Sequence, residues 1–327
     1  MTGAVDLVEV IRGDRVESVH RGHAVICDGA GEVMEAWGDP AAMIYPRSSC
    51  KMIQALPLLE SGAGDILSDR QVALACASHQ GAAIHRSMVA DWLEGLGLGE
   101  ADLRCGPQEP RDMTERDRLI RAGDMPCQIH NNCSGKHAGF LMLNQHLGGG
   151  AEYNEIDHPT QVAIRAAFEE VTDMASPSWA IDGCSAPNFA TRMDALAGAM
   201  GRFAAARADG DGRARAMVRL RQAMGTAPEL VAGEGRACTD LMWAMEGKVA
   251  VKTGAEGVFV AIVPERAVGI AVKIADGATR AAEAVIAALL VRIGALDPAT
   301  PVAKRLTHGP IRNWNGLETG HYRVRVG

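Results

Sequence analysis

Residues 47–59 contain a serine and a lysine three positions apart, Ser48 and Lys51. In a helix, residues with this spacing share one face, so Ser48 Oγ and Lys51 Nζ could meet. A serine hydroxyl becomes nucleophilic when a neighbour takes its proton, and a lysine can do so if burial or nearby positive charge lowers its pKa. The apolar residues that follow Lys51 would bury such a helix. The alternative is a helix-capping serine followed by a solvated lysine.

Two further segments carry the same pair of residue types. Ser78 begins the sequence Ser-His-Gln-Gly after an apolar stretch, and Lys252 begins Lys-Thr-Gly at the end of a predicted strand. Together with Ser48-x-x-Lys51, these segments resemble the three-part motif of serine β-lactamases and penicillin-binding proteins. The alternatives are a serine that terminates a helix and an edge-strand lysine that discourages aggregation.

Two cysteines in separate polar segments, Cys133 and Cys184, could bind a metal ion. Thiolates suit a soft or borderline ion such as Zn²⁺. His137 is a candidate third ligand. Lys136 would first have to lose a proton, which a bound cation assists. Because the cysteines lack the Cys-x-x-Cys spacing of structural zinc sites, two buried thiols beside a solvated lysine are the alternative.

Six sequence blocks, in this order, resemble the Rhizobium etli-type L-asparaginases over nearly the whole chain. The blocks are residues 47–51, 77–81, 105–107, 130–137, 182–187 and 252–257. The resemblance implies a fold related to serine β-lactamases, hydrolysis of L-asparagine to L-aspartate and ammonia, and a homodimer.

The resemblance also implies a role for ten residues. Two Ser-Lys pairs would be catalytic: Ser48 with Lys51, and Ser78 with Lys252. Zn²⁺ would be held by Cys133, Lys136 and Cys184, near the substrate. The substrate pocket would be lined by Arg47, His137 and Asp182, with the arginine suited to the carboxylate of the amino acid and the aspartate to its ammonium.

Other functions remain compatible with the same residues. A serine-dependent glutaminase uses similar chemistry, and one methylene in the substrate is worth only about 1–3 kcal/mol in a pocket. A β-lactamase or peptidase is less expected, because a cytoplasmic chain would not meet those substrates. A thiol-rich metal-binding or redox scaffold built on Cys133 and Cys184 is the non-enzymatic alternative.

Composition narrows the class of protein. The net charge of −7 argues against nucleic acid or an anionic membrane as the main partner. The first residues show no basic region followed by an apolar one, so we expect no signal peptide, and no apolar run reaches the roughly 18 residues that span a bilayer. Eight cysteines in such a chain indicate thiols in a reducing compartment, which predicts a cytoplasmic protein.

The elements that must position these residues follow from hydrophobic periodicity and turn signals. We expect an α/β (α+β) fold, an antiparallel sheet flanked by helices, forming a single catalytic domain over 1–327 with a helical middle region at about 68–246. Residues 131–139 are expected to form a loop. Strands are expected at 5–11, 23–27, 33–37, 179–182, 249–253, 258–263, 268–274 and 321–326. Helices are expected at 82–96, 114–122, 158–171, 191–206, 212–224, 238–245 and 279–293.

Overall fold

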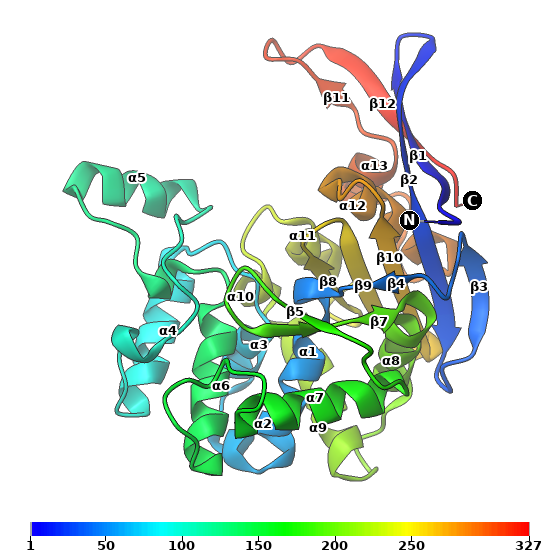
Figure 1. The fold of residues 1–327 in the computed structure, drawn as a ribbon. Helices are drawn as coiled ribbons and strands as arrows, with labels where there is room; N and C mark the ends of the chain where they lie inside the picture. Colours follow the sequence, from blue (N-terminus) through cyan, green and yellow to red (C-terminus); the bar gives the residue numbers. More distant parts are fainter. Residues whose placement is uncertain (1, 327) are drawn as a thin grey trace. The chain divides into compact units, whose positions relative to one another are not determined.

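The computed structural model describes residues 2–326 and divides into two compact units (Figure 1). Unit 1 is formed by the described residues up to Ser49, by Thr191–Ala205 and by those from Asp240 onward. Unit 2 is formed by Cys50–Ala190 and Ala206–Thr239. The single catalytic domain expected from the sequence stays a prediction.

Unit 1 is built on an eight-stranded antiparallel sheet. Its strand order is β11-β12-β1-β2-β10-β9-β8, and β3 pairs with β2 away from this path. A separate short ladder joins β4 (Met43–Ile44) to β7 (Thr191–Arg192). The strands of the main sheet are β1 Val5–Arg12, β2 Arg15–Asp28, β3 Val33–Trp37, β8 Ala250–Gly254, β9 Val258–Val263, β10 Val268–Ile274, β11 Ile311–Arg312 and β12 Glu318–Val324.

Helices pack on this sheet in unit 1. Every residue of β9 is buried, so this strand is covered on both faces. The helix α8 (Met193–Ala205) lies against β10 and β2, and α12 (Thr279–Arg292) lies against β10, β9 and β1. A Cβ atom on Gly269 would lie only 2.1 Å from the backbone nitrogen of Gly201, so α8 and β10 approach closely because residue 269 is glycine.

Unit 1 contains two further short helical segments. The 3₁₀ helix η5 (Pro264–Arg266) joins β9 to β10, and α13 (Pro301–Thr307) packs against α12. In Figure 1 the β11 and β12 strands, in red, continue the sheet beside β1 and β2.

Unit 2 is mainly helical. Its longest buried stretch is in α6, where every residue from Ser134 to Asn144 is buried. The helices α3, α4, α2 and α7 pack around α6. The elements are α1 Lys51–Gln54, α2 Leu56–Glu60, η2 Ala63–Ile66, α3 Asp69–Ala75, α4 Ala83–Gly95, η3 Glu100–Asp102, α5 Met113–Ala122, η4 Gln128–His130, α6 Ser134–Leu147, α7 Pro159–Thr172, β5 Trp179–Ile181, β6 Pro187–Phe189, α9 Gly212–Thr226 and α10 Pro228–Val231.

Two elements contain the positions at which the chain passes from one unit to the other. The 3₁₀ helix η1 (Arg47–Cys50) leads into α1, and α11 (Ala237–Ala244) follows α10. The Ser48 segment is therefore a 3₁₀ turn followed by a short α-helix, rather than one continuous α-helix.

The expected fold class is confirmed, as an antiparallel sheet with helices against it and a helical middle region. Two helices begin as local chemistry favours: Ser68 caps α3 in a capping box with Gln71, and Pro159 opens α7. Among residues 2–326, none of the helices combines the length and the apolar character needed to cross a membrane.

Three expectations about local structure were wrong or incomplete. The loop expected at 131–139 is largely helical, because α6 begins at Ser134. Its glycines permit close packing, since a Cβ on Gly135 would lie 2.5 Å from the Leu74 carbonyl oxygen, and such packing overrides weak helix propensity. The strand β2 begins at Arg15 instead of residue 23, because its exposed first half pairs with β1. No pattern in the sequence predicted α13 or β11.

Candidate active site

The ten predicted site residues divide between the two units. Arg47, Ser48 and Lys252 belong to unit 1. The other seven belong to unit 2: Lys51, Ser78, Cys133, Lys136, His137, Asp182 and Cys184. Each set is built by different elements, and each is described within its own unit.

In unit 1, the turn that carries Ser48 has an unusual backbone. Arg47 adopts a positive φ of 54°, a conformation that side-chain-bearing residues seldom take and that concentrates at functional sites. The next turn is fixed by Ser49, whose backbone N–H and hydroxyl both donate to the carbonyl of Pro46, at 3.2 and 2.7 Å. The side chain of Ser48 is half-buried.

Lys252 lies on β8, the last strand of the sheet, with 0% of its surface exposed. Its Nζ donates a hydrogen bond of 2.8 Å to the carbonyl of Thr253. The solvent-facing edge lysine considered as an alternative is therefore wrong. At the end of β8, a Cβ on Gly254 would lie 2.7 Å from the carbonyl oxygen of Pro46. The Lys252 strand thus packs against the turn that leads into Ser48.

In unit 2, Lys51 is buried, with 1% exposure. Its Nζ donates to the carbonyl of Ala77, the residue before Ser78, and lies 3.1 Å from Cys133 Sγ. The solvated first-turn lysine considered as an alternative is therefore wrong. The contacts join the start of α1, the segment that carries Ser78 and the residue that precedes α6.

The thiols of Cys133 and Cys184 form a buried pair. A hydrogen bond from Cys133 holds the pKa of Cys184 well below its usual range, and the nearby Lys136 ammonium acts in the same direction. The Lys136 Nζ atom lies 3.1 Å from Cys184 Sγ. Burial would lower the pKa of Lys136, but the two thiols raise it overall. One thiolate, one thiol and an ammonium group therefore share this interior.

These three side chains fit a zinc ion by their chemistry. Two sulfur donors and one nitrogen donor converge, and one sulfur is already stabilised as a thiolate. Within residues 2–326, no three His, Cys, Asp or Glu side chains are arranged as a metal site. The predicted ligand set differs from such a site because its third donor is the amine of Lys136. This lysine is buried, so the solvated lysine considered as the alternative is wrong.

His137 is buried beside these residues, and its hydrogen bond with Tyr153 determines which ring nitrogen of His137 carries the proton. The Tyr153 oxygen accepts the backbone N–H of Arg104 at 2.8 Å, so its own hydroxyl donates to His137 Nδ1 at 2.9 Å. Burial and the charge of Lys136 lower the pKa of His137 to about 4, so the ring is neutral with its proton on Nε2.

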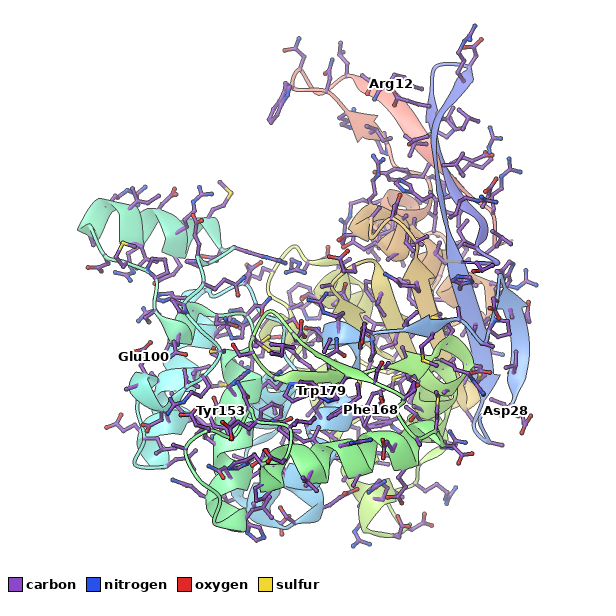
Figure 2. All side chains as sticks on the ribbon, viewed as in Figure 1. Arg12, Asp28, Glu100, Tyr153, Phe168 and Trp179 are labelled. Carbon is purple, nitrogen blue, oxygen red and sulfur yellow. The ribbon has the colours of Figure 1, made fainter. Side chains whose placement is uncertain are left out.

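The Nε2 atom of His137 is buried and makes no hydrogen bond of normal geometry to any of residues 2–326. The Cys184 sulfur lies close enough to raise the pKa of His137, as a hydrogen-bond acceptor would. It does not, however, form a hydrogen bond of normal geometry with the Nε2–H of His137. An unsatisfied buried N–H is costly. The group is therefore available to a ligand. The sequence identified His137 but not Tyr153, which Figure 2 labels and which no motif signalled.

A tight turn after β5 presents Cys184 and Asp182. The Asp182 backbone N–H donates to the carbonyl of Ala186 at 2.9 Å, and Ser185 has a positive φ of 67°. Asp182 lies near enough to Lys136 to raise the pKa of that amine. The structure thus places Asp182 beside the predicted metal ligands in unit 2.

The Ser78 segment is held by His79, which the sequence did not single out. The His79 ring accepts the Gly81 N–H at Nδ1, so Nε2 carries the proton and donates to Ser134 Oγ at 3.0 Å. The His79 backbone N–H donates to the Asn132 carbonyl, and Ser78 N–H donates to the Val231 carbonyl at 2.8 Å. These bonds tie the Ser78 segment to the first turn of α6.

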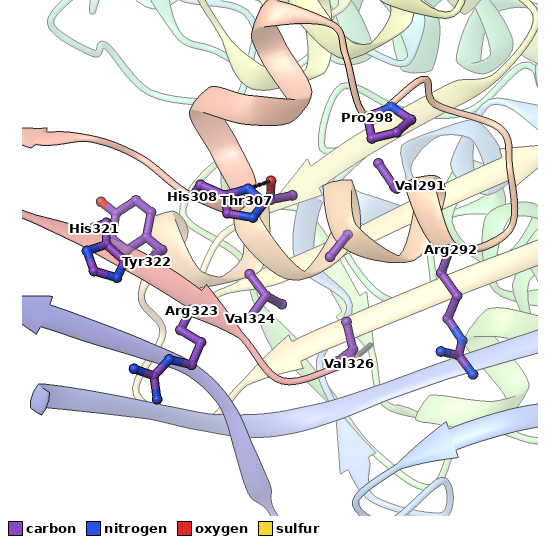
Figure 3. A pocket seen from close by; sticks show the side chains of 11 residues that line it. Val291, Arg292, Pro298, Thr307, His308, His321, Tyr322, Arg323, Val324 and Val326 are labelled. Carbon is purple, nitrogen blue, oxygen red and sulfur yellow. Dashed lines mark hydrogen bonds between the residues drawn. The ribbon is translucent and has the colours of Figure 1, made fainter.

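A cavity of about 500 Å³ in unit 1 lies away from these residues (Figure 3). It lies at α12, α13 and β12, and its walls include three valines, two histidines and Tyr322. None of the ten predicted residues lines it. Its size alone does not make it the active site.

A comparison with protein-family models finds one that matches residues 8–324, described as L-asparaginase II. The chain belongs to the L-asparaginase II family. It is therefore an amidohydrolase, an L-asparaginase, which is the family and the reaction type expected from its motifs. The scaffold alternative without enzymatic activity is thereby set aside. A comparison with curated protein sequences finds no significant match.

A comparison with solved structures finds several that are similar to this L-asparaginase II chain at low sequence identity. Mglu in its native form is 13% identical, covers 86% of this chain and has a TM-score of 0.41; the chain spans 66% of the length of Mglu. A β-lactamase from Mycobacterium bovis is also 13% identical, with 83% of this chain and 94% of that chain covered and a TM-score of 0.42. A penicillin-binding protein homologue from Pyrococcus abyssi is 12% identical, with 84% and 73% covered and a TM-score of 0.36.

Proposed function

We propose that this L-asparaginase hydrolyses L-asparagine through a serine nucleophile, Ser48, activated by Lys51. The observation that carries the proposal is the burial of Lys51 directly after the Ser48 turn. A lysine placed there for solubility would face water. Ser48 Oγ attacks the side-chain amide carbon while Lys51 accepts its proton, and water then releases aspartate from the acyl-enzyme.

In this proposal the second pair, Ser78 and Lys252, supports the first. Their hydrogen bonds and positive charge help to relay a proton to the leaving ammonia. Backbone N–H groups stabilise the oxyanion. Arg47 binds the substrate carboxylate and Asp182 its ammonium. His137, neutral and with a free Nε2–H, donates a hydrogen bond to the substrate.

Zinc is part of the proposal as a structural aid to substrate binding. Cys133, Lys136 and Cys184 would hold it, and the bound ion would supply a positive charge that orients the substrate. The proposed proton transfers are carried by the chain's own serines and lysines. The homodimer and the cytoplasmic location stay predictions.

The test is ammonia release from asparagine and from glutamine, measured side by side. We expect Ser48→Ala to lower kcat for asparagine by roughly 10³-fold or more. Ser87→Ala, which changes a hydroxyl on the exposed side of α4, serves as the matched control. A Ser48→Ala enzyme with wild-type turnover would refute the serine mechanism. Faster turnover of glutamine than of asparagine would make glutaminase the better description.

A further inference from the structure

Two arginines of unit 2, Arg111 and Arg236, carry positive charge without an acidic partner. Neither forms an ion pair or a side-chain hydrogen bond with any of residues 2–326. The Nη1 atom of Arg236 is buried and unbonded. Most other arginines of unit 2, by contrast, bond to a carboxylate or a carbonyl, as Arg70, Arg104 and Arg219 do.

The two chain segments that carry these arginines share a neighbour, Gln80. The N–H of Asp112, the residue after Arg111, donates to the Gln80 carbonyl at 2.9 Å. On the other side, Arg236 N–H donates to the carbonyl of Gly233, and a Cβ on Gly233 would lie 2.5 Å from the Gln80 side chain. Partial burial of its side chain, and then repulsion by Arg236, lowers the pKa of Arg111, while the Cys133 thiol acts the other way.

Asp112, the carboxylate next to Arg111 in the chain, does not neutralise this pair. Asp112 is engaged as the N-cap of α5, where its side chain accepts the N–H of Glu115. Two adjacent cations without a counter-ion destabilise the folded protein, and the free energy is recovered when an anion binds. Guanidinium groups bind carboxylates through paired hydrogen bonds, so a carboxylate is the ligand that they favour.

The pair lies beside the residues proposed to surround the reacting amide. Gln80 is two residues after Ser78, and Cys133 is close enough to act on Arg111. Hydrolysis converts the neutral side-chain amide of asparagine into a second carboxylate. Arg47 is already proposed to bind the carboxylate that the substrate brings, so no arginine of the proposed site is assigned to the new carboxylate.

We propose that Arg111 and Arg236 bind the carboxylate that hydrolysis creates, so that L-aspartate is retained as a product inhibitor. The inference rests on the proposed function for the identity of the ligand. The pair favours the charged product over the neutral amide, because only the product places negative charge there. The enzyme is thereby sensitive to the aspartate concentration.

The test compares Arg111→Gln and Arg236→Gln with wild type, using L-aspartate as both inhibitor and calorimetric ligand. We expect each variant to weaken aspartate binding by roughly 10- to 100-fold, with KM for asparagine essentially unchanged. Arg165→Gln removes an exposed arginine paired with Glu169 and should behave as wild type. Arg236→Lys, which keeps the charge, should restore part of the affinity.

Three results would overturn the inference. One is unchanged aspartate binding in both folded glutamine variants, and Arg111, being exposed, is the safer of the two sites to alter. Another is a rise in KM for asparagine equal to the loss of aspartate affinity, which would assign the pair to the substrate's own carboxylate. The third is displacement of aspartate by inorganic phosphate at equal concentration. If wild type releases no ammonia from asparagine, the proposed function fails, while calorimetry still decides whether the arginines bind aspartate.

Discussion

The phenol oxygen of Tyr153 lies 2.9 Å from Nδ1 of His137, and both side chains are fully buried. The same oxygen accepts the Arg104 N–H, and among residues 2–326 the acceptor for the hydroxyl proton is the imidazole Nδ1. The unbonded Nε2–H of His137 is thus oriented by a residue outside every motif that the sequence offered. This relationship leads to the first prediction.

Tyr153→Phe should remove the hydroxyl and keep the ring. His137 Nδ1 and the Arg104 N–H would then lose their partner, which should lower the free energy of unfolding by about 1–3 kcal/mol. If the imidazole turns over, kcat/KM for asparagine should fall by roughly tenfold. Urea unfolding and ammonia release measure the two effects. Tyr322→Phe on β12 is the control, and equal behaviour of the two variants would contradict the role given to Tyr153.

Zinc binding should depend on the buried thiol pair. We expect Cys133→Ser and Cys184→Ser to lose bound zinc, measured by metal analysis after dialysis against a weak chelator. Cys27, which is buried in unit 1 and has a pKa raised to about 12 by burial, provides the matched control as Cys27→Ser. Zinc retained by both site variants would refute the ligand assignment, whether or not the variants are active.

Stability should fall at mildly acid pH because of His23. Burial lowers the pKa of this histidine below 6.5, and its Nδ1 accepts the Asp39 N–H at 2.9 Å. The unfolded chain therefore binds the proton more readily. The stability contributed by neutral His23 is complete above pH 6.5 and is lost as pH falls toward the folded-state pKa.

The measurement is the free energy of unfolding between about pH 8 and pH 5. His23→Asn should show a smaller decrease over this range than wild type. His146, which is exposed on α6, gives the control substitution His146→Asn. If the free energy of unfolding fell equally with pH in wild type and His23→Asn, a group other than His23 would be responsible for the loss of stability at acid pH.

Gly269→Ala should destabilise unit 1 by about 1–3 kcal/mol, the usual range for overpacking. The added Cβ would meet Gly201 and Ala197 at 2.1 and 2.2 Å, so α8 would have to move away from β10. Gly95→Ala at the end of α4 meets nothing within 4 Å and should be neutral or stabilising by up to about 1 kcal/mol. A thermal melt of each variant checks the contrast, which a tolerated Gly269→Ala would contradict.

The sequence by itself determined the family and most elements of the fold. Apolar strand-forming segments located β9 and β10, and six ordered motifs located the residues that could carry out chemistry. These signals are local, because side-chain period, caps and motif spacing are written along the chain.

The tertiary structure decided which of those residues are buried and what they touch. Only packing could show that Lys51 contacts Cys133, that Lys136 contacts Cys184, and that Tyr153 orients His137. It also turned an expected loop into the first turns of α6, since Gly135 there packs tightly against Leu74. Such contacts join residues many positions apart, so neither periodicity nor propensity encodes them, and proton positions and unpaired charges depend on them.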